Sequence, residues 1–271
     1  MLKQLKRLAG SRELLWNLTL RELRTKYRRS FLGWTWSLLN PLSLVLTYGF
    51  VFGVVFGAVA PIGNPSGLNN YALYLLSGLL PWAFFALVTN LGMGTLIGNG
   101  GLIKKVAFSP ETLVFAQSIF SVVQFSIEIA VLIVIMLVIS GFTLVPWIPV
   151  TILLMFLLAV FSTGIALALS VVAVYFRDLT YLWTIMLQVY FFATPIIYDP
   201  EVLKAQVSPT VLRLLEWNPM AVFIRAFRST LYDAAAPEVS SLCFLAGISA
   251  LSLVLGFIIF HSLTRRLAEE L

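Results

Sequence analysis

The sequence predicts an all-α membrane protein with six transmembrane helices, and three observations carry that prediction. Of its 271 residues, 60% are hydrophobic and only 11% are charged, whereas a soluble domain carries about 25% charged residues. The mean hydropathy is +0.96. The apolar residues gather in long runs that lack the strict alternation of a transmembrane β-strand. This composition excludes a soluble globular enzyme, a disordered chain and a disulfide scaffold.

A helix needs roughly 20 mostly apolar residues to cross a membrane. Six segments of the sequence fit this requirement, at about residues 31–59, 71–92, 113–139, 147–174, 181–198 and 241–263. They divide the chain into a cytoplasmic amphipathic segment at 1–30, a six-span transmembrane domain at 31–263 and a cytoplasmic tail at 264–271.

The distribution of lysine and arginine predicts the orientation of these spans. Nine of the 18 basic residues precede the first span, two lie between spans two and three, one lies between spans four and five, and two follow the sixth. The other side receives only the remaining four. Because positive residues favour the cytoplasmic side, we expect both termini in the cytoplasm. Anionic lipid headgroups explain the net charge of +6, so no nucleic acid partner is expected.

Residues 12–29 are expected to form an amphipathic helix on the membrane surface. At 100° per residue, the side chains of Trp16, Leu20, Leu23 and Tyr27 fall on one stripe, opposite most of the charged residues. The segment is either an interfacial helix that feeds the first span and touches a cytoplasmic partner, or only an anchor that sets the topology.

Small and acidic residues inside the spans raise further alternatives. Gly49, Gly53 and Gly57 repeat every four residues in span one, which favours close helix packing, either within the chain or across a dimer. Glu128 is the only acidic residue deep inside a span. It is either a hydrogen-bonded structural group or the proton relay of a secondary transporter.

Several catalytic and nucleotide-binding motifs are missing from the sequence. It contains no G-x-x-x-x-G-K-[ST], no H-E-x-x-H, no C-x-x-C and no G-x-S-x-G. We therefore expect no catalytic residues, no metal and no cofactor bound by this chain. A membrane-embedded transferase would need an acidic metal-binding loop, and the predicted cytoplasmic loops show no paired aspartates.

A set of short motifs, spread over nearly the whole chain in a fixed order, resembles one known family. This is the permease subunit of ABC-2 type exporters of lipid-linked polysaccharides, which includes the O-antigen, teichoic acid and cell-wall galactan permeases. The motifs are Leu23-Arg24-Thr25-Lys26-Tyr27-Arg28-Arg29-Ser30-Phe31-Leu32-Gly33-Trp34, Asn40-Pro41, Gly78-Leu79-Leu80-Pro81-Trp82, Leu102-Ile103-Lys104-Lys105-Val106, Tyr175-Phe176-Arg177-Asp178-Leu179, Thr194-Pro195-Ile196-Ile197-Tyr198 and Asn218-Pro219-Met220.

The resemblance implies a homodimer in a bacterial inner membrane, bound to two copies of a separate ATPase subunit that holds ATP and magnesium. The cytoplasmic loop at about 98–112 is expected to dock on that ATPase, although Ser109 separates the aromatic and the proline that adjoin in the family. The docking residues would be Leu102, Ile103, Lys104, Lys105, Val106, Phe108 and Pro110.

The resemblance also implies a channel for a polymer attached to a polyprenyl diphosphate, and short re-entrant helices at about 199–240. The diphosphate would enter beside Arg24, Arg28 and Arg29. Aromatic residues at Tyr48, Trp82, Phe85, Tyr190 and Phe191 would line the channel, unless they serve lipid contact or core packing. At the external mouth, Arg225 and Arg228 would meet anionic groups near Asn218, unless they form a solvated loop face. The runner-up is a proton-coupled secondary transporter that uses Glu128.

Overall fold

The computed structural model describes residues 12–27, 36–57, 60–105, 108–198, 208 and 217–264. Every element in these ranges is helical, which confirms the all-α prediction. The elements are α2 (Arg12–Tyr27), α3 (Trp36–Tyr48), η2 (Gly49–Val55), α4 (Tyr71–Gly98), α5 (Gly100–Lys105), α6 (Glu111–Ser140), η3 (Gly141–Trp147), α7 (Ile148–Tyr175), α8 (Leu179–Phe192), α11 (Pro219–Arg228), η4 (Ser229–Asp233) and α12 (Val239–Thr264). Here η2 and η4 are π-helical and η3 is a 3₁₀ helix.

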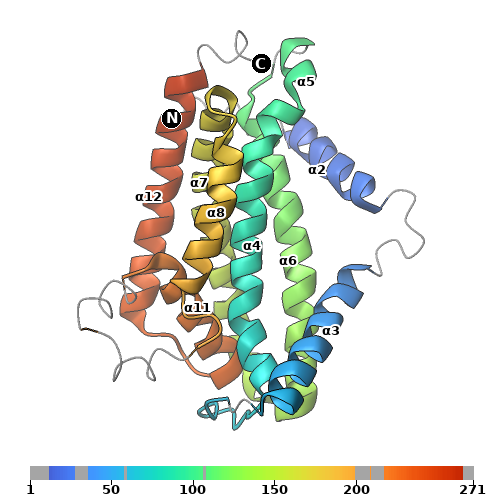
Figure 1. Ribbon diagram of the computed structural model, residues 1–271, viewed down its shortest axis with the longest axis vertical. Coiled ribbons are helices and arrows are strands. Elements are labelled where there is room, and N and C mark those ends of the chain that lie inside the picture. Colours follow the sequence, from blue (N-terminus) through green and yellow to red (C-terminus); the bar gives the residue numbers. More distant parts are fainter. Residues whose placement is uncertain are drawn as a thin grey trace.

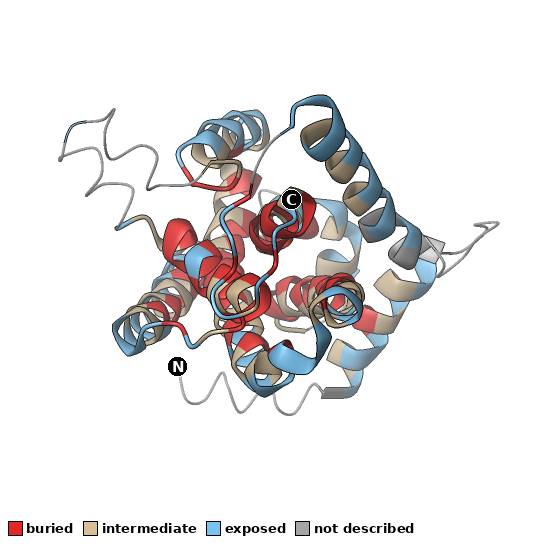
Figure 2. Ribbon diagram, turned by 90° about the horizontal axis from the view of Figure 1, so that it is seen from below, coloured by how far each residue is buried: buried red, intermediate tan, exposed pale blue. Residues whose placement is uncertain are grey.

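The long helices form an up-and-down bundle with α4 among α6, α7 and α8 (Figure 1). The short helix α5 and the amphipathic helix α2 lie at one end of the bundle, which we call the α5 end. The helix α11 lies at the opposite end, which we call the α11 end. Figure 2, viewed toward the α11 end, shows buried residues gathered on the inward faces of the helices and exposed ones around the outside.

Three stretches of the described chain are long and apolar enough to cross a membrane, namely Tyr71–Gly98, Glu111–Tyr175 and Val239–Leu263. The middle stretch holds two antiparallel helices, α6 and α7, joined by η3. Two further apolar helices, Leu42–Val55 and Leu179–Phe192, are shorter than the roughly 20 residues that a span needs. The helices follow the order of the predicted segments, and the count of six spans stays a prediction.

The helices α7 and α12 approach each other closely because both carry small residues at their contact. A Cβ atom added to Gly164 would meet the backbone of Ser252, and one added to Gly256 would meet the backbone of Gly164. The Ser249 and Ser252 hydroxyls donate hydrogen bonds across the same interface to the carbonyls of Leu157 and Phe161, at 2.9 and 2.8 Å. Small residues and serine hydroxyls are the contacts that hold helices together in lipid.

The amphipathic helix α2 forms where the sequence predicts it, but a different face packs on the bundle. Leu18 and Thr19 are buried on the side that contacts α6. Trp16, from the predicted stripe, is 60% exposed. Leu20 and Leu23 of the stripe are half-buried, and Trp16 is left on the outer surface, where a lipid interface would meet it.

The glycine repeat of span one does not pack within the chain along its length. Its segment is π-helical from Gly49 to Val55, and Gly57 lies beyond the end of that helix with a φ of 60°. A Cβ atom added to Gly49 would lie 3.6 Å from Ala72, whereas one added to Gly53 or Gly57 would meet nothing within 4 Å. Of the two alternatives, packing against the described part of the chain applies to Gly49 and not to Gly53 or Gly57.

Candidate functional site

The predicted docking loop forms a sharp corner between α4 and α5, centred on Asn99. The Asn99 carbonyl accepts hydrogen bonds from the N–H groups of Leu102 and Ile103, which begins α5, and its side-chain amide donates 2.9 Å to the Thr95 carbonyl of α4. Glycines flank Asn99 on both sides. Asn99 is the C-cap of α4, and its carbonyl is used by the first turn of α5 while its side chain bonds back to α4, so the long helix stops here.

The short helix α5 presents two different faces. Leu102 and Ile103 are half-buried against the apolar core, while Lys104 and Lys105 are exposed. Lysines in the last turn also suit the negative end of the helix dipole. The corner therefore displays two exposed cations on a helix whose apolar pair, Leu102 and Ile103, packs against the core.

The remaining predicted docking residues lie beside the start of α6. Phe108 and Pro110 are half-buried, and Pro110 is the N-cap residue of α6. The Ser109 carbonyl accepts a 3.0 Å hydrogen bond from the Thr112 N–H. Ser109, which separates the aromatic residue from the proline, therefore forms part of the turn that starts α6. Val106 lies outside the described residues.

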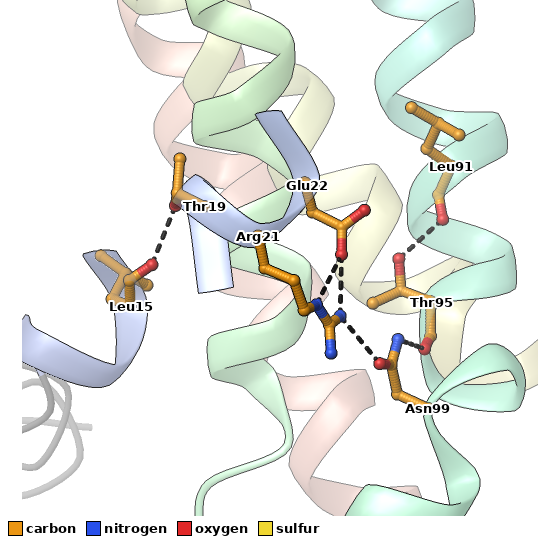
Figure 3. Close-up of polar contacts among 7 residues, drawn as sticks. All are labelled: Leu15, Thr19, Arg21, Glu22, Leu91, Thr95 and Asn99. Atoms are coloured by element: carbon orange, nitrogen blue, oxygen red, sulfur yellow. Dashed lines mark hydrogen bonds and ion pairs between the residues drawn. The ribbon is translucent and has the colours of Figure 1, made fainter. Parts of the chain in front are cut away.

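A cationic surface of α2 adjoins this corner. Arg21 and Arg24 are exposed and line a hollow of about 420 Å³ together with Asn17, Leu20 and Thr25. Arg21 also donates a 2.9 Å hydrogen bond to the side chain of Asn99 (Figure 3). The other two residues predicted to meet the diphosphate, Arg28 and Arg29, lie outside the described residues.

Four of the predicted channel residues form one aromatic cluster inside the bundle. The Trp82 ring lies edge-on to the rings of Tyr190 and Phe191, with centroids 5.3 and 5.6 Å away. The Phe85 ring stacks on Phe161 at 5.8 Å. Trp82 and Phe85 are buried, with Phe85 only 1% exposed, whereas Tyr190 and Phe191 are half-buried. Trp82 and Phe85 thus lie deeper in the bundle than Tyr190 and Phe191.

The fifth predicted channel residue, Tyr48, lies apart from this cluster. Its ring stacks on Phe52 at 5.9 Å, and Phe52 in turn contacts Tyr71 at 5.2 Å. Tyr48 is half-buried at the end of α3. A channel lining by all five aromatic residues stays a prediction.

At the α11 end, Asn218 ties two elements together. Its side-chain oxygen caps α11 by accepting from the N–H groups of Met220 and Ala221, and accepts a 2.6 Å hydrogen bond from the Tyr190 hydroxyl. Its amide nitrogen donates to the Ala193 carbonyl at the end of α8. Asn218 therefore fixes the start of α11 against the end of α8.

Arg228 makes the second connection between these elements. It is 7% exposed, and its Nη1 and Nη2 atoms donate to the carbonyls of Pro195 and Ile196 at 2.8 and 2.5 Å. The guanidinium lies 3.9 Å above the Tyr74 ring, and a Cβ atom added to Gly78 would lie 3.2 Å from its Nη2. Buried and bonded to the backbone, Arg228 is neither a solvated loop residue nor an open contact for anionic groups. Its neighbour Arg225 is exposed.

A third connection at the α11 end involves Tyr232 of η4. Its hydroxyl lies 2.8 Å from the Pro61 carbonyl and 3.0 Å from that of Leu68, and it accepts from the Asn70 N–H at 3.3 Å. The Ser66 hydroxyl donates to the Tyr232 carbonyl. The loop before α4 is thereby fastened over η4.

Asp233 follows Tyr232 in the same connection. Burial raises the pKa of its carboxyl group, opposed by a hydrogen bond from the Asn64 backbone and by the charge of Arg228. The protonated form of Asp233 is thus favoured more in the folded protein than in the unfolded chain.

With this geometry in place, comparison with known proteins identifies the family. Residues 13–232 match the ABC-2 type transporter family. The chain belongs to that family. The match covers the corner at Asn99, the aromatic cluster and the three connections at the α11 end.

Curated relatives of this ABC-2 family member extend over its whole length. It is 27% identical to proteins named O-antigen export system permease protein RfbA, over 96% of this chain and 95% of the Klebsiella pneumoniae protein, and over the full length of both chains for the Myxococcus xanthus protein. It is 25% identical to the polysialic acid transport protein KpsM of Escherichia coli, over 90% of this chain and 91% of that protein. These relatives are polysaccharide transport proteins.

Glu128 of this ABC-2 protein is buried and accepts a 3.1 Å hydrogen bond from the Gln124 amide one turn earlier on α6. A hydrogen-bonded, buried carboxyl group is the geometry expected of the structural alternative.

Sequence reasoning missed the partners of Arg21, Arg228 and Tyr232, since each contact joins residues far apart in the chain. A local signal did exist for Asn218, because asparagine followed by proline is typical of a helix N-cap and first helical position. The glycines around Asn99 gave a similar signal for the end of α4.

Proposed function

We propose that this chain is the permease subunit of an ATP-driven exporter that carries a polyprenyl-diphosphate-linked polysaccharide across the bacterial inner membrane. The observation that carries the proposal is the full-length similarity to O-antigen export permeases. The O-antigen and polysialic acid named for the relatives are both polysaccharides, which supports a glycan polymer as the substrate class.

The energy comes from a separate ATPase subunit, present in two copies, which binds ATP and magnesium. Two features support this assignment: the sequence lacks a phosphate-binding loop, and α5 displays Lys104 and Lys105 at the end of the bundle. Leu102 and Ile103 anchor α5 to the core, so a push on α5 passes into α4.

The permease works as a homodimer whose two copies enclose the channel. The helix α8 supports this arrangement, because Leu187 is its only buried residue, and Val189 and Phe192 are 66% and 69% exposed. The exposed face around Gly53 supports it as well, since no side chain of the described protomer covers it. Half-buried Tyr190 and Phe191 contact the sugar rings. The more deeply buried Trp82 and Phe85 hold the side chains of Tyr190 and Phe191 in position.

The lipid diphosphate binds first at the cationic hollow of α2. Arg24 forms the described part of this site, and Arg28 and Arg29 continue it along the chain. Arginine binds phosphate groups through paired hydrogen bonds, and the amphipathic helix α2 would hold Arg24 at headgroup level. In this orientation the α5 end faces the cytoplasm, with both termini on that side.

Reconstitution in liposomes tests the function. The permease is co-purified with its proposed ATPase partner, and transport of a polyprenyl-diphosphate-linked O-antigen polysaccharide into the lumen is measured with ATP and without it. We expect substrate-stimulated ATP hydrolysis and transport that requires ATP. Replacing both Lys104 and Lys105 with Glu should abolish binding of the ATPase, whereas replacing both with Arg should preserve it.

Two results would overturn the proposal. One is transport by the permease alone without nucleotide, which the proton-coupled alternative through Glu128 predicts. The other is unchanged binding of the ATPase when both Lys104 and Lys105 are replaced with Glu, which would show that α5 is not the docking surface.

A further inference from the structure

The amphipathic helix α2 and the corner between α4 and α5 are joined by one side chain. The Arg21 Nη2 atom donates to the Asn99 Oδ1 atom at 2.9 Å and to the Glu22 Oε1 atom at 2.7 Å, and its Nε atom donates to the same Glu22 oxygen at 3.2 Å (Figure 3). Glu22 thus orients the guanidinium toward Asn99. Among the described side chains of α2, Arg21 is the only one with a hydrogen bond to another element.

Asn99 occupies the pivot of the corner. Its backbone carbonyl starts α5, and its amide nitrogen donates to Thr95 in the last turn of α4. This donation leaves Oδ1 as the free acceptor, and that atom receives Arg21. A rotation of α5 about the corner therefore displaces Asn99, and with it the hydrogen bond to Arg21.

The contact between Arg21 and Asn99 does not hold α2 in place. The side chains of Arg21 and Glu22 are 45% and 31% exposed, and pairs this exposed add little to stability. The buried side chains Leu18 and Thr19 seat α2 on α6 instead. The contact with Asn99 sets the orientation of α2 but does not attach α2 to the bundle. The helix can therefore tilt together with α5 while its buried side chains keep it on α6.

We propose that Arg21 and Asn99 form a joint through which movement of α5 repositions α2, so that Arg21 is a positioning residue for coupling ATP hydrolysis to substrate uptake. The inference rests on the proposed function, because it requires an ATPase that moves α5. It assigns roles to Asn99, at the pivot of the docking loop, and to Arg21, which lines the same hollow as Arg24 and was not among the residues predicted to meet the diphosphate.

The test compares ATP hydrolysed with polysaccharide transported in the reconstituted permease–ATPase complex. Arg21→Gln and Asn99→Ala should each lower the substrate transported per ATP about twofold, as expected for loss of an exposed charged hydrogen bond. The double variant should be no worse than either single variant, because both remove one interaction. Arg21→Glu combined with Asn99→Lys should restore transport per ATP.

Two further variants separate a joint from other roles. Glu13→Gln, an exposed change on the same helix, should leave every readout unchanged. Arg24→Gln should raise the substrate concentration needed for half-maximal transport, whereas Arg21→Gln should lower the yield per ATP at saturating substrate. Equal yields for Arg21→Gln and wild type, or additive losses in the double variant, would overturn the joint. Failure of the wild-type complex to couple at all would instead overturn the proposed function.

Discussion

The two ends of the bundle are built by opposite means. At the α11 end, the buried side chains of Arg228 and Tyr232 and the half-buried Asn218 connect segments far apart in the sequence. At the α5 end, the exposed Arg21 makes the hydrogen bond that links α2 to the corner at Asn99. Segments with exposed polar contacts open at lower free energy than segments with buried ones. The difference indicates a rigid α11 end and a movable α5 end.

The contrast follows from the backbone at each end. After α8, residues 193–198 are irregular, and carbonyl groups buried without a partner are costly. Arg228, Asn218 and Tyr71 supply donors to the carbonyls of Pro195, Ile196, Ala193 and Ile197. At the α5 end, the corner satisfies its own carbonyl through the first turn of α5, so its connection to α2 can be an exposed hydrogen bond.

Replacing Arg228 should have the largest effect on stability. Arg228→Met leaves the carbonyls of Pro195 and Ile196 without their donors, at a cost of about 3 kcal/mol for two charged hydrogen bonds. Thermal unfolding in detergent, followed by size-exclusion chromatography, measures the loss. Arg225→Met, on the exposed side of the same helix, is the matched control, and equal effects of the two would break the contrast between the ends.

Asn218→Ala should rank second. It removes the cap of α11 together with the Tyr190 and Ala193 hydrogen bonds, at about 2 kcal/mol. Hydrogen exchange should rise in residues 193–198 and in the first turn of α11. Asn218→Asp keeps the capping oxygen and should lose about half as much; if both variants match wild type, Asn218 is not a structural connection.

Tyr232→Phe should cost about 1 kcal/mol, because it deletes the hydroxyl that holds Pro61, Leu68 and Asn70. The ring stays, so the core remains filled. Hydrogen exchange should increase at 60–70 and remain unchanged at 99–105. Increased exchange at both ends would show that the two regions are not independent.

Asp233→Asn should have a smaller, pH-dependent effect. Since burial raises the Asp233 pKa above 3.8, its contribution to stability is greatest at low pH and declines as pH rises through the raised pKa. The melting temperature of the variant should therefore match wild type near pH 4 and exceed it at pH 7. An advantage for wild type at pH 7 would mean that Arg228 or the Asn64 backbone outweighs burial.

Arg21→Gln should have the smallest effect on unfolding, below about 0.5 kcal/mol, because the contact is exposed. Its melting curve should overlay that of wild type in the absence of the ATPase. A melting temperature reduced as much as that of Tyr232→Phe would show that the α5 end, too, depends on polar contacts for its stability.

The sequence predicted the helical class and the order of the helices because each depends on local composition. A long apolar run specifies a helix wherever the bilayer replaces water, whichever neighbours it later packs against. The predicted amphipathic helix also forms, although the side that faces α6 carries Leu18 and Thr19. Hydrophobic periodicity found a stripe for lipid, and it could not show which side another helix would cover.

The candidate site was predicted in its parts and not in its connections. The pattern of apolar segments placed Lys104 and Lys105 in one loop, and the predicted channel aromatic residues in three spans. Arg228 illustrates what was out of reach, because an arginine beside Arg225 in a stretch broken by prolines carries the same signal whether it is solvated or buried. Only the packing of residues 195–196 against α11 shows that Arg228 is buried and not solvated.

From its sequence alone, this protein was determined to be an α-helical membrane protein with an amphipathic helix before its spans. Tertiary structure alone decided which arginine is buried, which aromatic residues lie behind others, and that α2 is joined to α5 through Arg21. The physical reason is the range of the interactions. Hydropathy and capping act within a few turns of helix, whereas a hydrogen bond between residues some 30 to 170 positions apart exists only once the helices have packed.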